Sequence, residues 1–380
     1  MIPLHRPVYE TIEQEYLASA MEYQTGQTSF CELNEKWLAS YTGRNAILTN
    51  SCTAALEMSA ELLHAQPGME VIMPSFTFSS TANAFVKAGL IPVFVDIRKD
   101  TLNLDENKLE EAITDKTVAI VPMHYAGIAC EMDKITDIAK VYKLAVIEDA
   151  AQALGARYKG EKLGSIGDFG CVSFHETKNF SMGEGGAFFC KDKVSYDEAV
   201  IYAECGTNRR QLAKGEIREY SWIEKGTSCI PSELACKFLY PQLMCSEKII
   251  SDRLDTWNYY YDSFKVYGDK EWLEIPVVPE YCEHNGHIFH IRVKDKTCRD
   301  NLLDFLRENG VMAAFHYIPL HSSPAGRKYG RFHGTDKVTT KASESLIRLP
   351  LYYGMKQEDK EKVVEVVDEW LHQQRKAGML

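Results

Sequence analysis

Residues 144–190 read LAVIEDAAQALGARYKGEKLGSIGDFGCVSFHETKNFSMGEGGAFFC, in which three apolar runs are separated by polar, glycine-containing segments. The runs Leu144–Asp149, Cys171–Phe174 and Ala187–Cys190 have the length and composition of buried strands. Charged side chains stand at the end of the first run and in the loop after the second. The stretch therefore predicts neighbouring strands of one sheet with reactive groups near their ends.

The alternation of short strands and helices extends back to about residue 45. Further predicted strands are Glu70–Met73, Ile91–Ile97 and Thr117–Met123. Predicted helices lie between the strands, at Thr53–Leu63, Ser79–Ala88, Asp105–Ile113 and Asp133–Tyr142. Strands that alternate with amphipathic helices are typical of an α/β fold, in which helices cover a mostly parallel sheet.

The pattern changes after residue 232, so we predict two domains. A helical stretch through Ser263 is followed by an alternating strand at Gly286–Lys294 and by helices at Asp300–Glu308 and Gln357–Gln373. A chain of 380 residues is long for one small core. The expected division is a large domain, residues 1–245, that includes the N-terminal segment, and a smaller α+β domain, residues 246–380.

Composition indicates an ordinary folded protein with small-molecule ligands. The chain is 45% hydrophobic and carries a net charge of −11, which argues against a broad basic face for nucleic acid or an anionic membrane. The longest apolar runs have strand length, and MIPLHRPVYETIEQEY at the N-terminus contains no secretory signal. We therefore predict a cytoplasmic location. The eleven cysteines include no Cys-x-x-Cys pair and are expected to be reduced, mostly buried thiols.

Glu148 and Asp149 end the first apolar run of the quoted stretch. A carboxylate at the carboxyl end of a parallel strand faces the ligand crevice of an open α/β sheet. A helix N-cap is the alternative role for Asp149, because Ala-Ala-Gln follows it.

Lys178 follows the second run and stands 29 residues after Asp149. Adjacent strands would deliver the two side chains to the same crevice, although a single lysine is more often solvated on the surface. The turn Gly183-x-Gly185-Gly186 has the wrong spacing for a dinucleotide motif and precedes a strand, not a helix. Pyridoxal 5′-phosphate (PLP) chemistry requires a lysine that condenses with the aldehyde and a carboxylate that keeps the pyridine nitrogen protonated.

A phosphate anchor and a stacking ring would complete such a site. The turn Asn50–Thr53 leads into an amphipathic helix whose first N–H groups suit an anion, or it is an ordinary cap. Ser173 adds a hydroxyl on the strand before Lys178. Phe76 or Phe78 in PSFTF offers an aromatic face, unless both are core residues, which we expect more strongly for Phe78.

Three histidines in the C-terminal half invite a metal interpretation, which the strand pattern disfavours. Residues 286–293 alternate like a strand, so His287 and His290 point to opposite faces, and His284 lies outside the run. We expect no metal site.

These motifs resemble the DegT/DnrJ/StrS family of nucleotide-sugar aminotransferases. The likeness runs from Ile2 to the C-terminal helix and rests on SCTAALEM, GMEVIMPSFTF, VPMHYAG, VIEDAAQALGA, and SFHETKN with GEGGA. It implies the PLP fold type I (aspartate-aminotransferase-like) architecture, with a mostly parallel seven-stranded sheet. It also implies that Lys178 forms the Schiff base and that Asp149 pairs with the pyridine nitrogen. The remaining implied cofactor contacts are Gln152 beside the phenolic oxygen, Phe76 on the ring, and Cys52, Thr53 and Ser173 at the phosphate.

The resemblance further implies a homodimer in which the partner completes each phosphate site. Family members commonly supply an asparagine there from a Gly-x-Asn-Tyr-Arg segment. This sequence has Gly226-Thr227-Ser228-Cys229-Ile230 instead. Ser228 would therefore have to reach the phosphate with a shorter hydroxyl, directly or through water.

The implied reaction moves the amino group of L-glutamate onto a nucleotide-linked 4-keto-6-deoxyhexose, with TDP as the expected carrier. Amination at C3 and PLP-dependent dehydration are the alternatives, and Lys178 argues against dehydration because dehydrating relatives tend to replace this lysine. A non-catalytic PLP-binding regulator is a further alternative. His316, Tyr317, His321, Arg209 and Arg210 lie in segments that the resemblance places near the cleft, without an assigned sugar contact.

Overall fold

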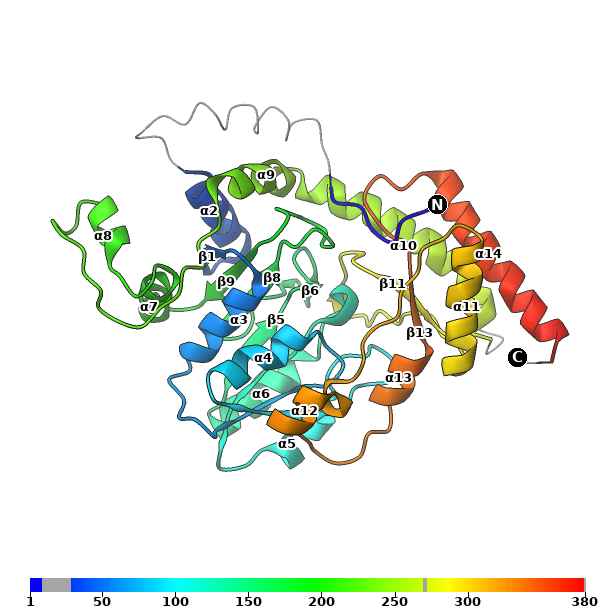
Figure 1. Ribbon diagram of the computed structural model, residues 1–380, viewed down its shortest axis with the longest axis horizontal. Helices are drawn as coiled ribbons and strands as arrows, with labels where there is room; N and C mark the ends of the chain where they lie inside the picture. The colour runs from blue at the N-terminus through cyan, green and yellow to red at the C-terminus, as the bar shows by residue number, and fades with distance from the viewer. Residues whose placement is uncertain (9–28, 269–271, 379–380) are drawn as a thin grey trace.

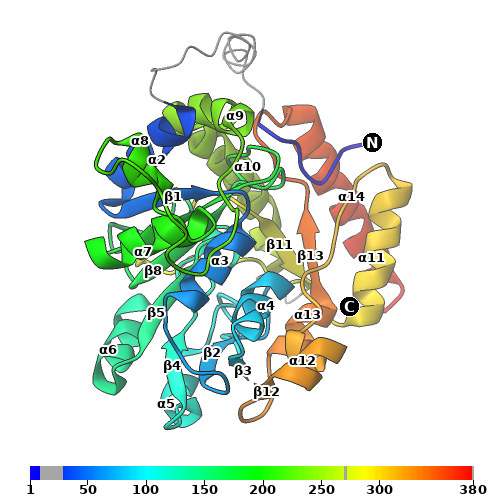
Figure 2. The same ribbon diagram turned by 60° about the vertical axis from the view of Figure 1, so that its left-hand side comes forward.

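The computed structural model describes residues 1–8, 29–268 and 272–378, and its centre is one large sheet (Figures 1 and 2). Within the described residues the strand order is β1-β9-β8-β5-β4-β2-β3-β12. The pairs β1–β9 and β9–β8 are antiparallel, and the other neighbours are parallel. In sheet order the strands are Asn45–Thr49, Gly186–Cys190, Phe169–Ser173, Ala145–Asp149, Thr117–Ile120, Glu70–Pro74, Ile91–Val95 and Arg331–Phe332.

The sheet has one strand more than the seven we expected. Two of its strands, β1 and β12, are not among the six runs that the sequence analysis named. The strand β12 has two residues, comes from the C-terminal third, and pairs with β3 at one edge of the sheet. Two residues are too few to show an alternating pattern, so nothing in the sequence indicated β12. The predicted strands and helices between residues 45 and 190 are otherwise present, with bounds that shift by a few residues.

Both faces of the sheet are buried under helices, as its continuous apolar strands require. Alternate residues of β2 enter different cores, with Val71 and Met73 on one face and Ile72 on the other. The first face packs against α3 (Cys52–Glu61), α4 (Ser79–Lys87) and α7 (Lys193–Ala203). The second packs against α2 (Phe30–Thr42), α6 (Met132–Tyr142) and α9 (Glu233–Met244).

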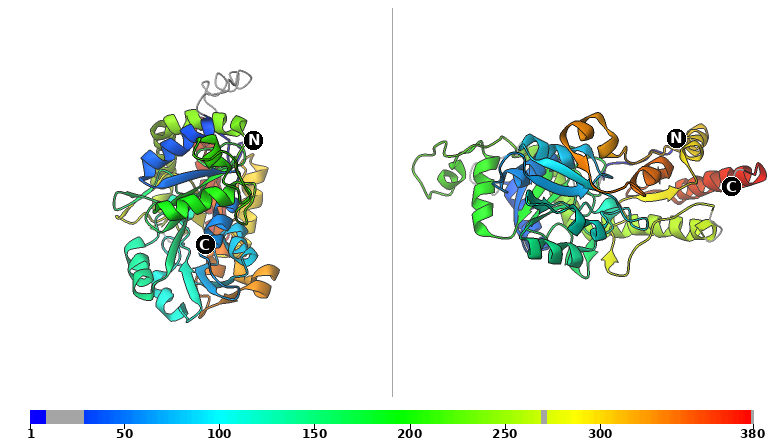
Figure 3. Two further views of the ribbon diagram at one scale, coloured as in Figure 1. Left: turned by 90° about the vertical axis from the view of Figure 1, so that its left-hand side faces the viewer. Right: turned by 90° about the horizontal axis from the view of Figure 1, so that it is seen from below.

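The C-terminal part has its own apolar core. It contains the antiparallel pair β11 (Phe289–Arg292) and β13 (Leu346–Leu349), packed with α10 (Ser246–Gly268), α11 (Lys296–Glu308) and α14 (Gln357–Lys376). Figure 3 shows α10 and α14 side by side at the end of the molecule opposite α8 (Arg209–Ala213).

The expected boundary at residue 245 coincides with the break between α9 and α10, and the division itself stays a prediction. Chain segments cross it in both directions. Ile2 packs in the C-terminal core, whereas β12 joins the large sheet.

The remaining short elements are β6 (Arg157–Tyr158), β7 (Glu161–Lys162), β10 (Cys282–Glu283), α12 (Pro324–Tyr329), α13 (Thr339–Ser345), η3 (Tyr125–Gly127) and η4 (Leu320–Ser322).

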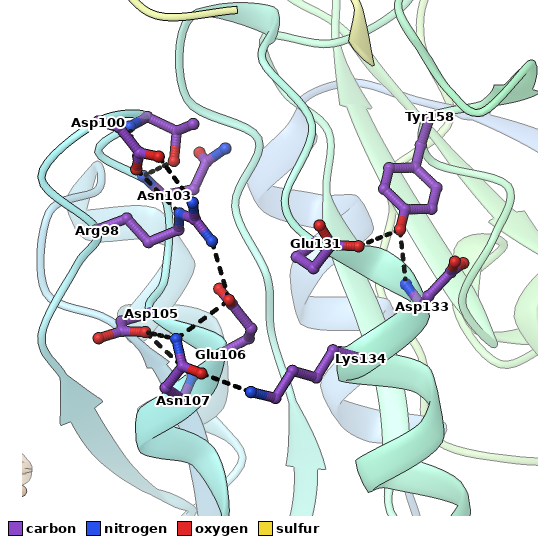
Figure 4. A network of polar contacts seen from close by, with 11 residues as sticks. Arg98, Asp100, Asn103, Asp105, Glu106, Asn107, Glu131, Asp133, Lys134 and Tyr158 are labelled. Carbon is purple, nitrogen blue, oxygen red and sulfur yellow. Dashed lines mark hydrogen bonds and ion pairs between the residues drawn. The ribbon is translucent and has the colours of Figure 1, made fainter. Parts of the chain in front are cut away.

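The predicted helix at residues 105–113 divides into a 3₁₀ turn, η2 (Glu106–Lys108), and a single turn of α-helix, α5 (Leu109–Ala112). A set of polar contacts, here called the Arg98 network, fixes this segment (Figure 4). Arg98 donates through Nε and Nη2 to Asp100, at 2.9 and 2.7 Å, and through Nη1 to Glu106 at 2.9 Å. Asn107 then accepts from Lys134 of α6 at 2.5 Å. The network ties the segment after β3 to α6.

All eleven cysteines are free thiols, seven of them buried, as expected. In the three described ranges, every helix is too short or too polar to span a bilayer. The second half of the N-terminal stretch that we interpreted as lacking a secretory signal, residues 9–16, lies outside the described residues.

Candidate active site

A cavity of about 600 Å³ opens at the end of the large sheet where β5 and β8 finish. Among the residues that line it are Asp149, Lys178, Cys52, Thr53 and Ser173. These residues come from three separate parts of the sequence, and the parallel pairing of β5 with β8 brings two of them together. The cavity therefore contains both the carboxylate and the amine that the sequence analysis singled out.

The acidic pair at the end of β5 divides between the two faces of the sheet, as strand geometry requires. Asp149 faces the cavity. Glu148 points away and is fully buried, where it accepts hydrogen bonds from the backbone N–H groups of Gly164, Ile166 and Gly167 at 2.7–2.8 Å. Its second oxygen also lies 3.0 Å from His124 Nε2. Glu148 thus organises two loops, and Asp149 is left for the cavity.

Hydrogen bonds orient the Asp149 carboxylate. The Thr81 hydroxyl donates to it at 2.6 Å, and the N–H of Ala151 donates at 3.1 Å. Burial raises the pKa of Asp149 above its usual range, and the two hydrogen bonds oppose that change. A protonated ring nitrogen placed opposite would compensate the buried charge.

Lys178 lies in the loop of the hairpin formed by β8 and β9. Backbone hydrogen bonds close this loop, from Lys178 N to His175 O at 2.9 Å and from Met182 N to Phe174 O at 2.9 Å. Burial lowers the pKa of the lysine amine to about 8, against the opposing effects of Cys52 and Asp149. A lowered pKa leaves more of the amine neutral and nucleophilic near neutral pH.

The N-terminus of α3 forms an anion cradle beside these two groups. The Ser51 side chain caps the helix by accepting from Ala54 N at 3.1 Å. The N–H groups of Cys52 and Thr53, in the first turn, cannot be reached by carbonyls within the helix. Gly186 lets the glycine turn approach closely, because a Cβ there would lie 2.5 Å from Cys52 N. The cap and the anion site, which we weighed as alternatives, are compatible.

The two phenylalanines of PSFTF occupy places opposite to our expectation. Phe76 is 0% exposed and packs edge-on against Tyr125 and Tyr317, with ring centroids 5.1 and 5.6 Å away, and it does not line the cavity. Phe78, which we expected in the core, is 60% exposed and lines the cavity. Phe78 is the residue just before α4, so its side chain leaves the sheet edge as the backbone turns into the helix.

Of the two predicted cofactor contacts Gln152 and Ser228, only Gln152 lies at the cavity. Gln152 lines the cavity, accepts from Ala126 N at 2.6 Å and donates to the Tyr317 hydroxyl at 2.9 Å. Ser228 does not line the cavity, and its carbonyl accepts from Asn50 Nδ2 at 3.4 Å. The role of Ser228 in a partner's phosphate site stays a prediction.

The residues considered for sugar recognition separate into two groups. His316 and Tyr317 line the cavity. His321 instead contacts Ser75 at 2.7 Å, and both arginines, Arg209 and Arg210, pair with Glu204. The arginines therefore serve an ion-pair cluster outside the cavity wall.

The sequence analysis missed two charged lining residues, Glu184 in the loop between β8 and β9 and Arg348 of β13. It also left His287 without a role, whereas His287 lines the cavity and contacts Asn179 at 2.8 Å. An arginine inside an apolar strand, LIRLP, was the available signal for Arg348. Within the described ranges, no group of three or more metal-ligating side chains is found.

The donor set of the cavity fits PLP. An amine, a buried carboxylate and a helix N-terminus line one cavity, which matches the aldehyde, the pyridine nitrogen and the phosphate of that molecule. Bound there, PLP supplies an electron-accepting ring that stabilises negative charge on a substrate carbon. The fold and the cavity together define the class of fold type I PLP enzymes.

Comparison with known proteins gives the family. The DegT/DnrJ/EryC1/StrS aminotransferase family matches residues 10–368. The spore coat polysaccharide biosynthesis protein SpsC of Bacillus subtilis is 31% identical and covers 95% of this chain and 92% of its own length. The UDP-4-amino-4-deoxy-L-arabinose–oxoglutarate aminotransferase of Shewanella sediminis is 31% identical and covers 97% of both chains.

Solved structures agree with that assignment. Spr1654 of Streptococcus pneumoniae, in its PMP form, superposes with a TM-score of 0.89 at 27% identity, over 98% of this chain and 100% of that one. The same protein has also been solved in a PLP form. The chain belongs to the DegT/DnrJ/EryC1/StrS aminotransferase family, and it is a PLP-dependent aminotransferase.

Proposed function

We propose that this enzyme transfers the amino group of L-glutamate to the keto carbon of a TDP-linked 4-keto-6-deoxyhexose, giving a 4-amino-4,6-dideoxy sugar. The observation that carries the proposal is the presence of Asp149 and Lys178 in one cavity beside the α3 N-terminus. The sugar substrate is supported by the names of relatives and by the segments GTNRRQ and HYIPLHSSPAG, which resemble TDP-4-oxo-6-deoxy-D-glucose aminotransferases. The reduced thiols support a cytoplasmic enzyme.

The residue roles follow from what each group can do at its position. Lys178 would hold the cofactor aldehyde and then move a proton to and from the substrate carbon. Asp149 would keep a proton on the ring nitrogen. The N–H groups of Cys52 and Thr53, with the Ser173 hydroxyl, would hold the phosphate. Phe78 replaces Phe76 as the ring that covers the cofactor.

The remaining contacts are Gln152 and Ser228. Gln152 would lie beside the phenolic oxygen, held there by its hydrogen bonds to Ala126 and Tyr317. We propose a homodimer in which Ser228 of one copy reaches the phosphate of the other. Sedimentation velocity of the purified enzyme tests the dimer, and a monomer at micromolar concentration would contradict it.

Absorption spectroscopy tests the proposed transamination. Mixing the PLP-loaded enzyme with L-glutamate should remove the visible band of the lysine-linked cofactor and leave the spectrum of pyridoxamine phosphate. An unchanged spectrum with L-glutamate and other amino-acid donors would overturn the proposal and favour the regulator alternative. Lys178→Ala serves as the control that should show no conversion.

Product analysis tests the regiochemistry. The pyridoxamine form should be reoxidised by TDP-4-keto-6-deoxy-D-glucose, with nitrogen found at C4 of the sugar by NMR. If the nitrogen is found at C3, introduced into a 3-keto isomer of the sugar, the enzyme is a C3 aminotransferase and C4 amination is contradicted. Loss of the hydroxyl at C3 without nitrogen transfer would indicate dehydration.

A further inference from the structure

Asp149 is a buried carboxylate with few hydrogen-bond donors. Among the described residues it accepts from the Thr81 hydroxyl at 2.6 Å and from Ala151 N–H at 3.1 Å, one bond to each oxygen. A carboxylate has about four acceptor positions, so about half of those of Asp149 stay open beside the cavity that it lines. The charge of Asp149 therefore depends strongly on each donor that it has.

Asp96, another buried carboxylate, has a fuller set of donors. They are the Thr339 hydroxyl at 2.7 Å and four backbone N–H groups at 2.8–3.1 Å, those of Ile97, Lys337, Val338 and Thr339. Burial acts to raise the pKa of Asp96, but the hydrogen bonds outweigh burial and the pKa is lowered. At Asp149 burial dominates and the pKa is raised, and the Thr81 hydrogen bond is the largest of the opposing effects.

The direction of the hydrogen bonds behind Asp149 follows from counting protons. The ionised carboxylate can only accept, so the single hydroxyl proton of Thr81 points to it. The Thr77 hydroxyl lies 2.8 Å from the Thr81 oxygen, and because the Thr81 proton is already used, Thr77 is the donor. Both threonines are buried, 1% and 0% exposed. Hydrogen bonds therefore run from Thr77 through Thr81 to Asp149, and each one strengthens the next.

Thr81 lies in the first turn of α4, where a threonine hydroxyl could instead bond a nearby backbone carbonyl. Thr136 of α6 does so, and it donates to Met132 O at 2.8 Å. Thr81 donates to Asp149 at the end of β5, 68 residues away in the sequence. The hydrogen bond from Thr77 holds the Thr81 hydroxyl in the orientation that reaches the carboxylate.

We propose that Thr81, oriented by Thr77, keeps Asp149 ionised and so leaves the shared proton on the ring nitrogen of the bound cofactor. This inference rests on the proposed role of Asp149. A hydrogen bond to a carboxylate favours its charged form, and without that bond the buried carboxylate competes better for the proton. Thr81 does not line the cavity, so it is a positioning residue that acts through Asp149.

Nitrogen NMR tests the position of the proton. The probe is 4-deoxypyridoxine 5′-phosphate with ¹⁵N in the ring, which lacks the aldehyde and binds without reacting with Lys178. In the saturated wild type, its ring nitrogen should show the chemical shift of a protonated pyridine. In Thr81→Val the ratio of unprotonated to protonated nitrogen should rise about 10- to 100-fold, because a hydrogen bond to a charged group is lost. An unchanged ratio in the folded, probe-bound variant would overturn the proposal.

Three further variants separate the hydroxyl from the shape of the side chain. Thr81→Ser keeps the donor and should hold the ratio within about threefold of wild type. A ratio as high as in Thr81→Val would show that Thr81 acts through packing, against the proposal. Thr77→Val removes only the orienting donor and should raise the ratio less than Thr81→Val does. Thr136→Val, the matched control, should leave the ratio unchanged.

The two half-reactions give a second readout. Both depend on a protonated ring nitrogen, so Thr81→Val should slow the reaction with L-glutamate and the reoxidation by the keto sugar by the same factor. The L-glutamate concentration that gives the half-maximal rate should change less than about threefold, because Thr81 lies behind Asp149 and outside the cavity wall. A rise in that concentration at an unchanged maximal rate would place Thr81 at the substrate and contradict the proposal.

The probe experiment also distinguishes this inference from the proposed function, because the probe binds without transamination. A protonated ring nitrogen in the wild type and equally in every Thr81 variant would reject the inference and leave the role of Asp149 intact. An unprotonated nitrogen already in the wild type would reject the role of Asp149, and the inference with it.

Discussion

The Arg98 network and the active-site cavity use the same side-chain chemistry in opposite ways. Arg98 has carboxylate partners on Nε, Nη1 and Nη2, and the effect of Asp100 raises its pKa. Arg348 has one neutral partner, and burial lowers its pKa. The first arrangement fixes a loop. The second leaves a buried guanidinium nitrogen, Nε, without a hydrogen bond to the described residues at the wall of a cavity.

Arg253 shows that burial without a carboxylate does not by itself indicate a ligand. It is buried, and burial lowers its pKa to about 9. Its guanidinium nevertheless donates to the carbonyls of Gly286, His287 and Leu351 at 2.8–3.3 Å. Arg253 is therefore satisfied as a structural residue beside the segment that carries His287. Arg348 differs because its Nε has no acceptor among the described residues, although the residue lines a cavity.

We expect the largest effect from Lys178→Ala, which removes the amine on which the proposed amino transfer depends. Amino transfer should fall about a thousandfold or more, because the residue is both nucleophile and proton carrier. Stability should change little, since the side chain faces open cavity. Steady-state rates check this, with Lys159→Ala, an exposed lysine paired with Asp133 near the Arg98 network, as a matched control. Near-normal turnover in Lys178→Ala would refute the assigned role.

The pH dependence of cofactor capture should report the same amine. Lys178 has a pKa of about 8, below the ordinary lysine value of 10.5. Only the neutral amine attacks the aldehyde, so capture of PLP by the cofactor-free enzyme should speed up as pH rises and level off above about 8. Each pH unit below 8 should slow it about tenfold. Stopped-flow absorbance checks this, and a rate that continues to rise through pH 10 would show an unperturbed lysine.

Asp149→Asn should weaken PLP binding about 10- to 100-fold, since it removes a charge-assisted hydrogen bond to the ring nitrogen. Ala151 N–H can still donate to the amide oxygen, and the Thr81 hydroxyl can accept from the amide NH2, so the loop should stay in place. Equilibrium dialysis of PLP measures the effect. Unchanged affinity together with unchanged turnover would show that the carboxylate does not meet the ring.

The sequence predicted that Asp149 and Lys178 share a cavity because strand ends have a fixed position in a parallel sheet, so local patterns were enough to bring the two residues together. It missed Arg348 because a buried donor without an acceptor can be recognised only from the packing of the folded chain. It missed β12 because two residues are too few to show a period. In PSFTF both phenylalanines fit a core, and only the turn into α4 decided which one faces the cavity.

The Arg98 network should matter for stability and not for chemistry. Arg98→Gln leaves Glu106, which is 5% exposed, without its cation, and should lower the free energy of unfolding by about 2 kcal/mol. Donor and cofactor affinities should be unchanged. Urea denaturation checks the first expectation, with the exposed Arg307→Gln as a control that changes stability little. A loss of donor affinity in Arg98→Gln would remove the contrast with the cavity.

The smallest effect is expected from Phe78→Ala, which tests the reversed placement of the two phenylalanines. Loss of an aromatic face over the cofactor should weaken PLP binding about 2- to 10-fold, because ring contacts contribute about 0.5–1.5 kcal/mol. The exposed side chain contributes little to folding. Phe76→Leu should do the reverse, lowering stability by about 1 kcal/mol through a small cavity beside Tyr125 and leaving PLP affinity intact. If Phe76→Leu weakened PLP binding and Phe78→Ala did not, the ring over the cofactor would be Phe76.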